Sequence, residues 1–113
     1  MRIVRGTVVL PADAPEGTAS LLLVEARDVS LMDAPSVVVA EARLPDVAVH
    51  PDGRVPFELE VPDAEAGHTL AARAHLSYDG TAAITPGDAI SVTHLAIPPE
   101  GDVSGLEVPL RVI

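Results

Sequence analysis

Alternation of apolar and polar residues over 55–80 constrains this chain more than any other feature. Phe57, Leu59 and Val61 alternate with glutamates, and a second alternating run covers 70–78. A period of two gives a strand one dry face and one wet face. The stretch therefore predicts two strands, 55–61 and 70–78, that pair antiparallel over a core. An alanine-rich helix over 63–74 is the alternative, and Gly67 and the alternation after it favour the strand.

Similar patterns elsewhere predict an all-β protein. We expect further strands over 3–10, 19–29, 36–44, 89–97 and 105–113, and a short return strand over 81–84. Proline, glycine and aspartate separate them, and 45–54 is expected to be a long loop. A chain of 113 residues fits one domain, 1–113. The predicted architecture is an antiparallel β-sandwich of seven or eight short strands.

Two residues inside expected strands carry positional information. Gly6 indicates a bulge or a close approach of another backbone. Pro109 cannot donate to a ladder, so it favours an edge position for the last strand. The Asp79-Gly80 dipeptide is the strongest hairpin signal in the chain.

The composition excludes several partners. The net charge is −10, with seven arginines and no lysine, so we expect no nucleic-acid binding and no attraction to an anionic membrane. No apolar run approaches about 18 residues, so we expect no direct membrane insertion. The location is expected to be cytoplasmic if Met1 is the natural start, and periplasmic or cell-envelope if a signal has been removed.

The titratable residues show no catalytic pattern. His68, His75 and His94 lack the spacing of known metal motifs, and no serine has a nucleophile context. Most of these titratable residues are expected to be ordinary solvent-facing side chains. We therefore expect no enzymatic activity and no cofactor. A small-molecule or metal-binding accessory role through these histidines and acidic residues is the alternative hypothesis.

Two apolar runs place apolar side chains on both faces of their strands. One face of 21–24 and of 37–39 enters the core, and the other then needs a cover. We predict a partner surface made of Leu21, Leu23, Val37 and Val39. Loop 45–54 would cover it within the molecule; otherwise a protein partner or a second copy of the chain covers it.

The loop that follows residue 27 is the other candidate binding site. Asp28, Ser30 and Asp33 lie in the segment DVSLMDAP. Short polar side chains of this kind bond neighbouring backbone amides as turns, and we favour that structural role over ligand binding.

Three segments resemble the YscW/YbaY-like lipoprotein family. Residues 24–44 (VEARDVSLMDAPSVVVAEARL) are similar to its LEDVSLADAPSVVIAEQ segment, 56–59 to its PFEL strand, and 70–80 to its strand ending in a D-G turn. The resemblance implies a small β-sandwich, commonly an exported lipoprotein, whose pilotin-like members help outer-membrane secretins assemble or localise. It implies no enzymatic activity. The leading hypothesis is thus a non-catalytic module that binds or chaperones a protein.

Overall fold

The structure, a computed structural model, describes residues 1–30, 36–81, 83–92 and 95–113. These ranges contain strands and no helix, which confirms the all-β prediction. The strands are β1 (Arg2–Val9), β2 (Gly17–Asp28), β3 (Val37–Val49), β4 (Arg54–Val61), β5 (Leu70–Ser77), β6 (Ala89–Ser91), β7 (Leu95–Ile97) and β8 (Val103–Val112).

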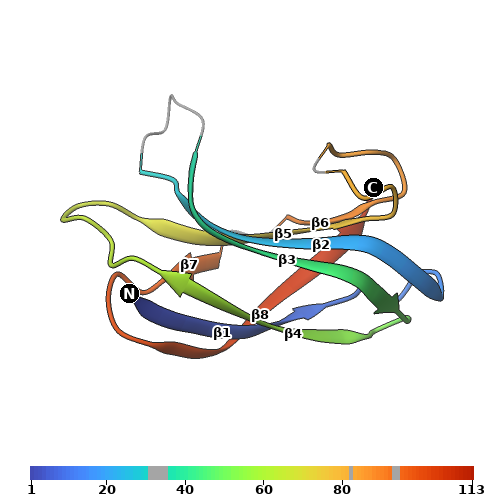
Figure 1. Cartoon of the computed structure of the whole chain (residues 1–113), viewed down its shortest axis with the longest axis horizontal. Coiled ribbons are helices and arrows are strands. Elements are labelled where there is room, and N and C mark those ends of the chain that lie inside the picture. The colour runs from blue at the N-terminus through green and yellow to red at the C-terminus, as the bar shows by residue number, and fades with distance from the viewer. Residues whose placement is uncertain (31–35, 82, 93–94) are drawn as a thin grey trace.

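The eight strands form one sheet in the order β3-β2-β5-β6-β8-β1-β4, with β7 beside β5. The sheet curls into two layers, with β2, β3, β5 and β6 in the upper layer of Figure 1 and β1 and β4 in the lower. β8 joins the layers, because its first part pairs with β1 and residues 110–112 pair with β6. The β1–β8 pairing is parallel. The expected antiparallel sandwich is therefore corrected to a mixed, nearly closed sheet.

The two strands predicted over 55–80 both form, as β4 and β5, but they do not pair with each other. β4 pairs with β1, and β5 pairs with β2, β6 and β7. Residues 62–69 carry the chain from one layer to the other, and no helix forms over 63–74. Alternation determines which face of a strand is dry, but it does not choose the neighbouring strand.

Three expected boundaries are wrong. β3 continues through the predicted loop 45–54 as far as Val49, because Asp46 takes a positive φ of 51° and kinks the strand without ending it. The kink turns Val47 and Val49 into the core. The described residues of 81–84 lie outside any strand, and the predicted strand 89–97 is two short strands, β6 and β7.

The prediction for Gly6 is confirmed, and the prediction for Pro109 is wrong. A Cβ at Gly6 would lie 2.3 Å from the carbonyl oxygen of Leu106 and 2.7 Å from Cζ of Phe57. The register of β1 on β8 also shifts next to this glycine. β8 is an inner strand, but Pro109 comes just before the residues that pair with β6, so its missing amide removes no bond to β6.

Apolar side chains from both layers fill the space between them. Burial of a valine or leucine side chain stabilises the fold by about 1.5–3 kcal/mol, so this cluster is the main source of stability. Its valines and leucines that are at most 1% exposed are Val4, Val8, Leu10, Leu22, Val24, Val49, Leu59, Val61, Leu76 and Val108.

The two edge strands, β3 and β4, face each other without pairing. They converge at the turn of residues 50–53, where the Gly53 amide donates to the His50 carbonyl at 3.0 Å. From that turn they diverge toward Val37 and Val61, as Figure 1 shows. We call this open side of the sheet, between β3 and β4, the seam.

Candidate partner-binding surface

A mostly apolar hollow of about 330 Å³, here called the seam groove, lies at the wide end of the seam. Its walls come from the start of β3, the end of β2 and the connection between β4 and β5. Val37 is 62% exposed there. An exposed apolar side chain beside an apolar hollow makes this region a candidate interaction surface. The residues that line the seam groove are Asp28, Val37, Val39, Pro62, Asp63, Ala64, Glu65, His68 and Leu70.

A one-residue irregularity in β3 turns its first valines toward the groove. Ala26 lies opposite Ala40, but Arg27 lies opposite Val38, so Val39 has no partner across the pair. One extra residue reverses the side of the sheet to which the following side chains point. The groove valines therefore share the inner side of the sheet with the core, against which Val39 packs.

The structure separates the four residues predicted to form one partner surface. Leu21 and Leu23 are only 7% and 5% exposed, and both lie outside the main core cluster, on the outer face of β2. Leu23 lines a second pocket of about 130 Å³ with Ile84 and Ile90. The loop after β5 thus helps to cover Leu23, whereas the predicted cover was residues 45–54, of which Pro45 lies opposite Leu21. Only the groove valines retain access to a partner.

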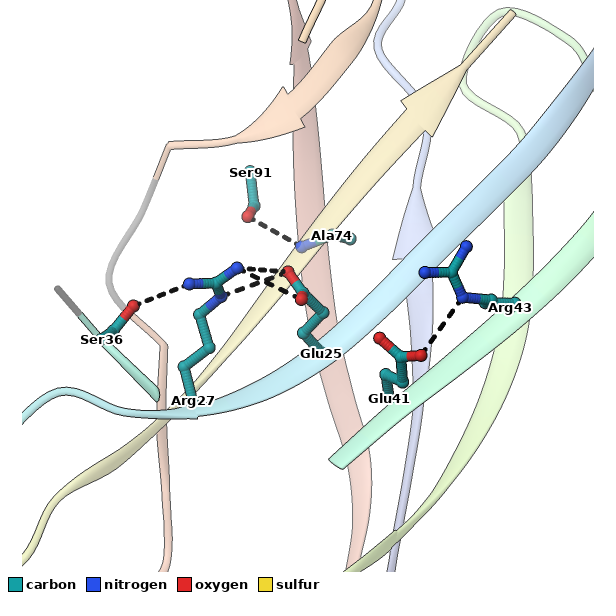
Figure 2. Close-up of polar contacts among 7 residues, drawn as sticks. All are labelled: Glu25, Arg27, Ser36, Glu41, Arg43, Ala74 and Ser91. Atoms are coloured by element: carbon teal, nitrogen blue, oxygen red, sulfur yellow. Dashed lines mark hydrogen bonds and ion pairs between the residues drawn. The ribbon is translucent and has the colours of Figure 1, made fainter. Parts of the chain in front are cut away.

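Two ion pairs lie on the outer face of β2 and β3. Arg27 donates to Glu25 through Nε and Nη2, both at 3.2 Å, and through Nη1 to the Ser36 hydroxyl at 2.9 Å. Arg43 donates to Glu41 at 3.2 Å on the neighbouring strand. Figure 2 shows both pairs side by side on β2 and β3. The side chains of these two pairs form their hydrogen bonds within the outer face. The seam groove is therefore the stronger candidate for binding a partner.

Asp28 and Ser30 fasten the end of β2 to the connection before β5. Asp28 Oδ1 accepts from the Ser30 amide at 3.0 Å and from its hydroxyl at 2.5 Å. The Ser30 hydroxyl in turn accepts from the Thr69 amide at 2.8 Å, and His68 Nδ1 lies 2.5 Å from Asp28 Oδ2. These bonds agree with the favoured structural role of this loop. Asp33 lies outside the described residues.

The Asp28–His68 pair places a charge-dependent contact on the groove wall. The hydrogen bond from His68, followed by those from Ser30, lowers the pKa of Asp28 from 3.8 to about 2. The same bond to Asp28 raises the pKa of His68 above its usual 6.5. Glu65 Oε2, 3.6 Å from His68 Nε2, acts in the same direction.

The histidines proposed as ligands do not meet. His75 is buried on β5, where Nε2 lies 2.7 Å from Asp88 Oδ2, whereas His68 lies at the seam groove. His94 lies outside the described residues. Within the ranges that the structure describes, no three histidine, aspartate or glutamate side chains come together as metal ligands would. The geometry of His68 and His75 therefore gives the metal hypothesis no support.

The rim of the groove is acidic. The side chains of Asp63 and Glu65 are 68% and 84% exposed. Below Asp63, the buried guanidinium of Arg2 comes within 3.6 Å of its carboxylate and donates to the carbonyls of Pro98 and Gly101. Sequence reasoning did not connect these acids with the valines of β3, because they are remote in the chain. The signal available in the sequence was Pro62, which follows the end of β4 and is itself followed by acidic residues.

The fold is that of a secretion pilotin. The structure of an alternative pilotin from the type II secretion system of Vibrio cholerae matches it with a TM-score of 0.67, covering 97% of this chain and 96% of that chain. The two sequences are 22% identical, so the likeness establishes the fold alone. A search of curated proteins found no match.

The family follows from the sequence profile. The profile of YscW, the type III secretion system lipoprotein chaperone, matches residues 1–97. This chain belongs to that family, which confirms the resemblance noted in three segments of the sequence. In the parts of the chain that are described, no helix has the length and hydrophobicity needed to cross a membrane.

Proposed function

We propose that this protein is a non-catalytic chaperone-like module that binds a protein partner through the seam groove. The observation that carries the proposal is the exposed Val37, beside Val39 in the groove, on a strand whose other edge is unpaired among the described residues. Membership of a family of lipoprotein chaperones supports a protein as the ligand. Family membership also supports a location at the cell envelope, where lipoproteins are anchored.

The partner that we propose first is the secretin of a secretion system. Pilotin-like members of the family, and the pilotin that shares this fold, belong to such systems. A secretin subunit must be kept from premature association before it assembles, and an apolar groove on a small acidic domain suits that task. The net charge of −10 keeps such a domain soluble while its groove is empty.

Co-purification tests the proposal. The protein and the secretin of its own cell are expressed together, and the amount of secretin retained is compared among variants. Val37→Asp places a charge at the groove and should reduce retention at least tenfold. Val92→Asp is the matched control, because Val92 is similarly exposed, at 58%, but does not line the groove.

Unfolding curves of both variants show whether the fold survives. We expect each to unfold within about 0.5 kcal/mol of the parent, since neither side chain is buried. Equal retention of the secretin by the parent and Val37→Asp would remove the groove as the binding surface. Loss of retention with both variants would point to a general effect of added charge and would also contradict the proposal.

A further inference from the structure

We infer that the seam groove receives an extended, cationic segment of the partner, which adds as a strand to the free edge of β3. This inference rests on the proposed function and specifies the chemistry of the partner. Four features of the groove carry it: an open strand edge, an opposite edge unsuited to pairing, an apolar floor and an acidic rim.

The edge of β3 is open where the seam is wide. β3 ends the strand order and pairs only with β2, so its other side has no strand partner among the described residues. Toward residues 47–49 it approaches β4 at the turn of the seam, whereas its first half stands apart from β4 (Figure 1). Unpaired amides and carbonyls of this kind are a template for an added strand.

The opposite edge is poorly suited to the same task. β4 contains Pro56, and Pro62 follows its last residue, so two amides are missing from that edge. Its exposed positions carry Glu58 and Glu60. Prolines and charges of this kind are how proteins protect an edge from pairing. The first half of β3 contains neither a proline nor a charge before Glu41, and begins with β-branched residues that favour a strand.

The floor of the groove suits alternate side chains of such a strand. Val39 and Leu70 pack against the core below, and Pro62 and Ala64 form the far wall. A volume of about 330 Å³ lies at the lower end of the range of about 300–1,000 Å³ for ligand pockets. An added strand places every second side chain toward this floor, and the groove selects apolar side chains at those positions.

The rim selects the charge of the remaining side chains. Asp63 and Glu65 extend into solvent at the groove mouth, and Asp28 lies on its wall. Arg2 offsets part of the charge of Asp63 from below, and His68 part of that of Asp28. Among the described residues, the only basic group within 4 Å of the Glu65 carboxylate is the imidazole of His68. A second copy of this chain would bring a like-charged rim and a net charge of −10 to the contact. Lysine or arginine on the partner complements the rim.

Synthetic peptides on the full chain test this inference. The probe is an acetylated peptide of about eight residues, the length of an ordinary strand, with alternating valine and arginine. A second peptide has glutamate in place of arginine. A third keeps the arginines but carries N-methyl groups on alternate amides, which preserves charge and apolar area while removing backbone pairing. Binding is measured by calorimetry, and its location by amide chemical shifts.

The inference predicts a specific order of affinities. The arginine peptide should bind, shift the amides of residues 37–42, and lose at least tenfold affinity on N-methylation. The glutamate peptide should not bind. Asp63→Asn with Glu65→Gln should weaken binding at low salt and have less effect at high salt, because salt screens exposed charges. Asp13→Asn with Glu16→Gln, on the loop near the narrow end of the seam, is the matched control.

Other results overturn the inference and leave the proposed function separately testable. Equal binding of the N-methylated peptide would exclude strand addition, and equal binding of the glutamate peptide would exclude charge selection. No binding of the arginine peptide up to about 1 mM would exclude both. A dimer that light scattering detects in the parent but not in Val37→Asp would assign the edge to a second copy. In any of these cases, loss of the secretin with Val37→Asp alone would still support a groove that binds a partner in another form.

Discussion

The two ends of β3 carry the same kind of residue in opposite surroundings. At the far end Val47 and Val49 are 8% and 0% exposed, and at the near end Val37 is 62% exposed. Both ends have the same neighbour, β2, on one side. The difference lies across the seam, where β4 closes over the far end and diverges from the near end (Figure 1).

The comparison shows that one strand can contribute to the core at one end and to the proposed binding surface at the other. A run of valines specifies the strand at both ends, because β-branched side chains favour extended backbone. Whether those valines stabilise the fold or stay available depends on how far the two edges of the sheet converge. The near end of β3 thus keeps apolar side chains exposed without weakening the core at the far end.

The largest effect should come from exchanging a core valine for a charge. Val49→Asp buries a carboxylate in the core and removes a fully buried side chain. We expect a loss of more than about 4 kcal/mol, a large part of the 5–15 kcal/mol that stabilises a typical domain. Urea unfolding followed by circular dichroism measures it. Val37→Asp is the paired variant, and similar losses at the two ends would refute the contrast drawn here.

An intermediate effect should come from the closed side of the molecule. Gly6→Ala places a methyl group against the Leu106 carbonyl and the ring of Phe57, and the carbonyl belongs to the backbone and cannot rotate away. We expect a loss of about 1–3 kcal/mol, with unfolding midpoints as the measurement. Thr7→Ala, the next residue on β1, should change stability by less than about 0.5 kcal/mol. A neutral Gly6→Ala would mean that β1 is packed less tightly against β4 and β8 than the contact distances indicate.

The smallest effect should be the pH dependence of the groove wall. The raised pKa of His68 means that its contribution is complete below pH 6.5 and disappears as pH rises through the raised value. The lowered pKa of Asp28 means that its contribution is complete above 3.8 and is lost as pH falls toward 2. The pair is therefore most stabilising between pH 3.8 and 6.5.

Thermal unfolding of His68→Gln tests that window. The difference in Tm between the parent and the variant should be largest near about pH 5 and should shrink toward about pH 9, where the imidazole of the parent is neutral. Asp28→Asn should show the same trend. A difference that stays constant over this range, or that grows with pH, would mean that the ion pair does not contribute as its geometry suggests.

Much of the strand content could be predicted, because alternation is a local property. The patterns of residues 55–61 and 70–78 identified β4 and β5 closely, and Gly6 marked the close approach of β1 to its neighbours β4 and β8. The neighbours of these strands could not be predicted, since pairing depends on how residues 62–69 cross between the layers. Pro45 and Asp46 had the composition of a loop, but a single left-handed residue kinks the strand and lets it continue.

The predicted partner surface stays a prediction, and the structure divides its four residues between two places. The run 37–39 was correctly identified as having more apolar residues than one face can bury. Leu21 and Leu23 were assigned to the same surface because the offset at Val39 is invisible in a period of two. The acids on the rim could not be assigned to the groove, because they reach it only through the fold.

The parallel contact between β1 and β8 has a consequence for the order in which this protein folds. β8 pairs with a strand far from it in the sequence, and it is the strand that joins the layers. The match to the family ends at residue 97, before β8 begins. Pairing strands that are distant in sequence is slow, because much of the chain between them must be ordered before the contact forms. We therefore expect the two layers to unite late in folding, and a chain cut at the boundary of the family match would lack the strand that unites them.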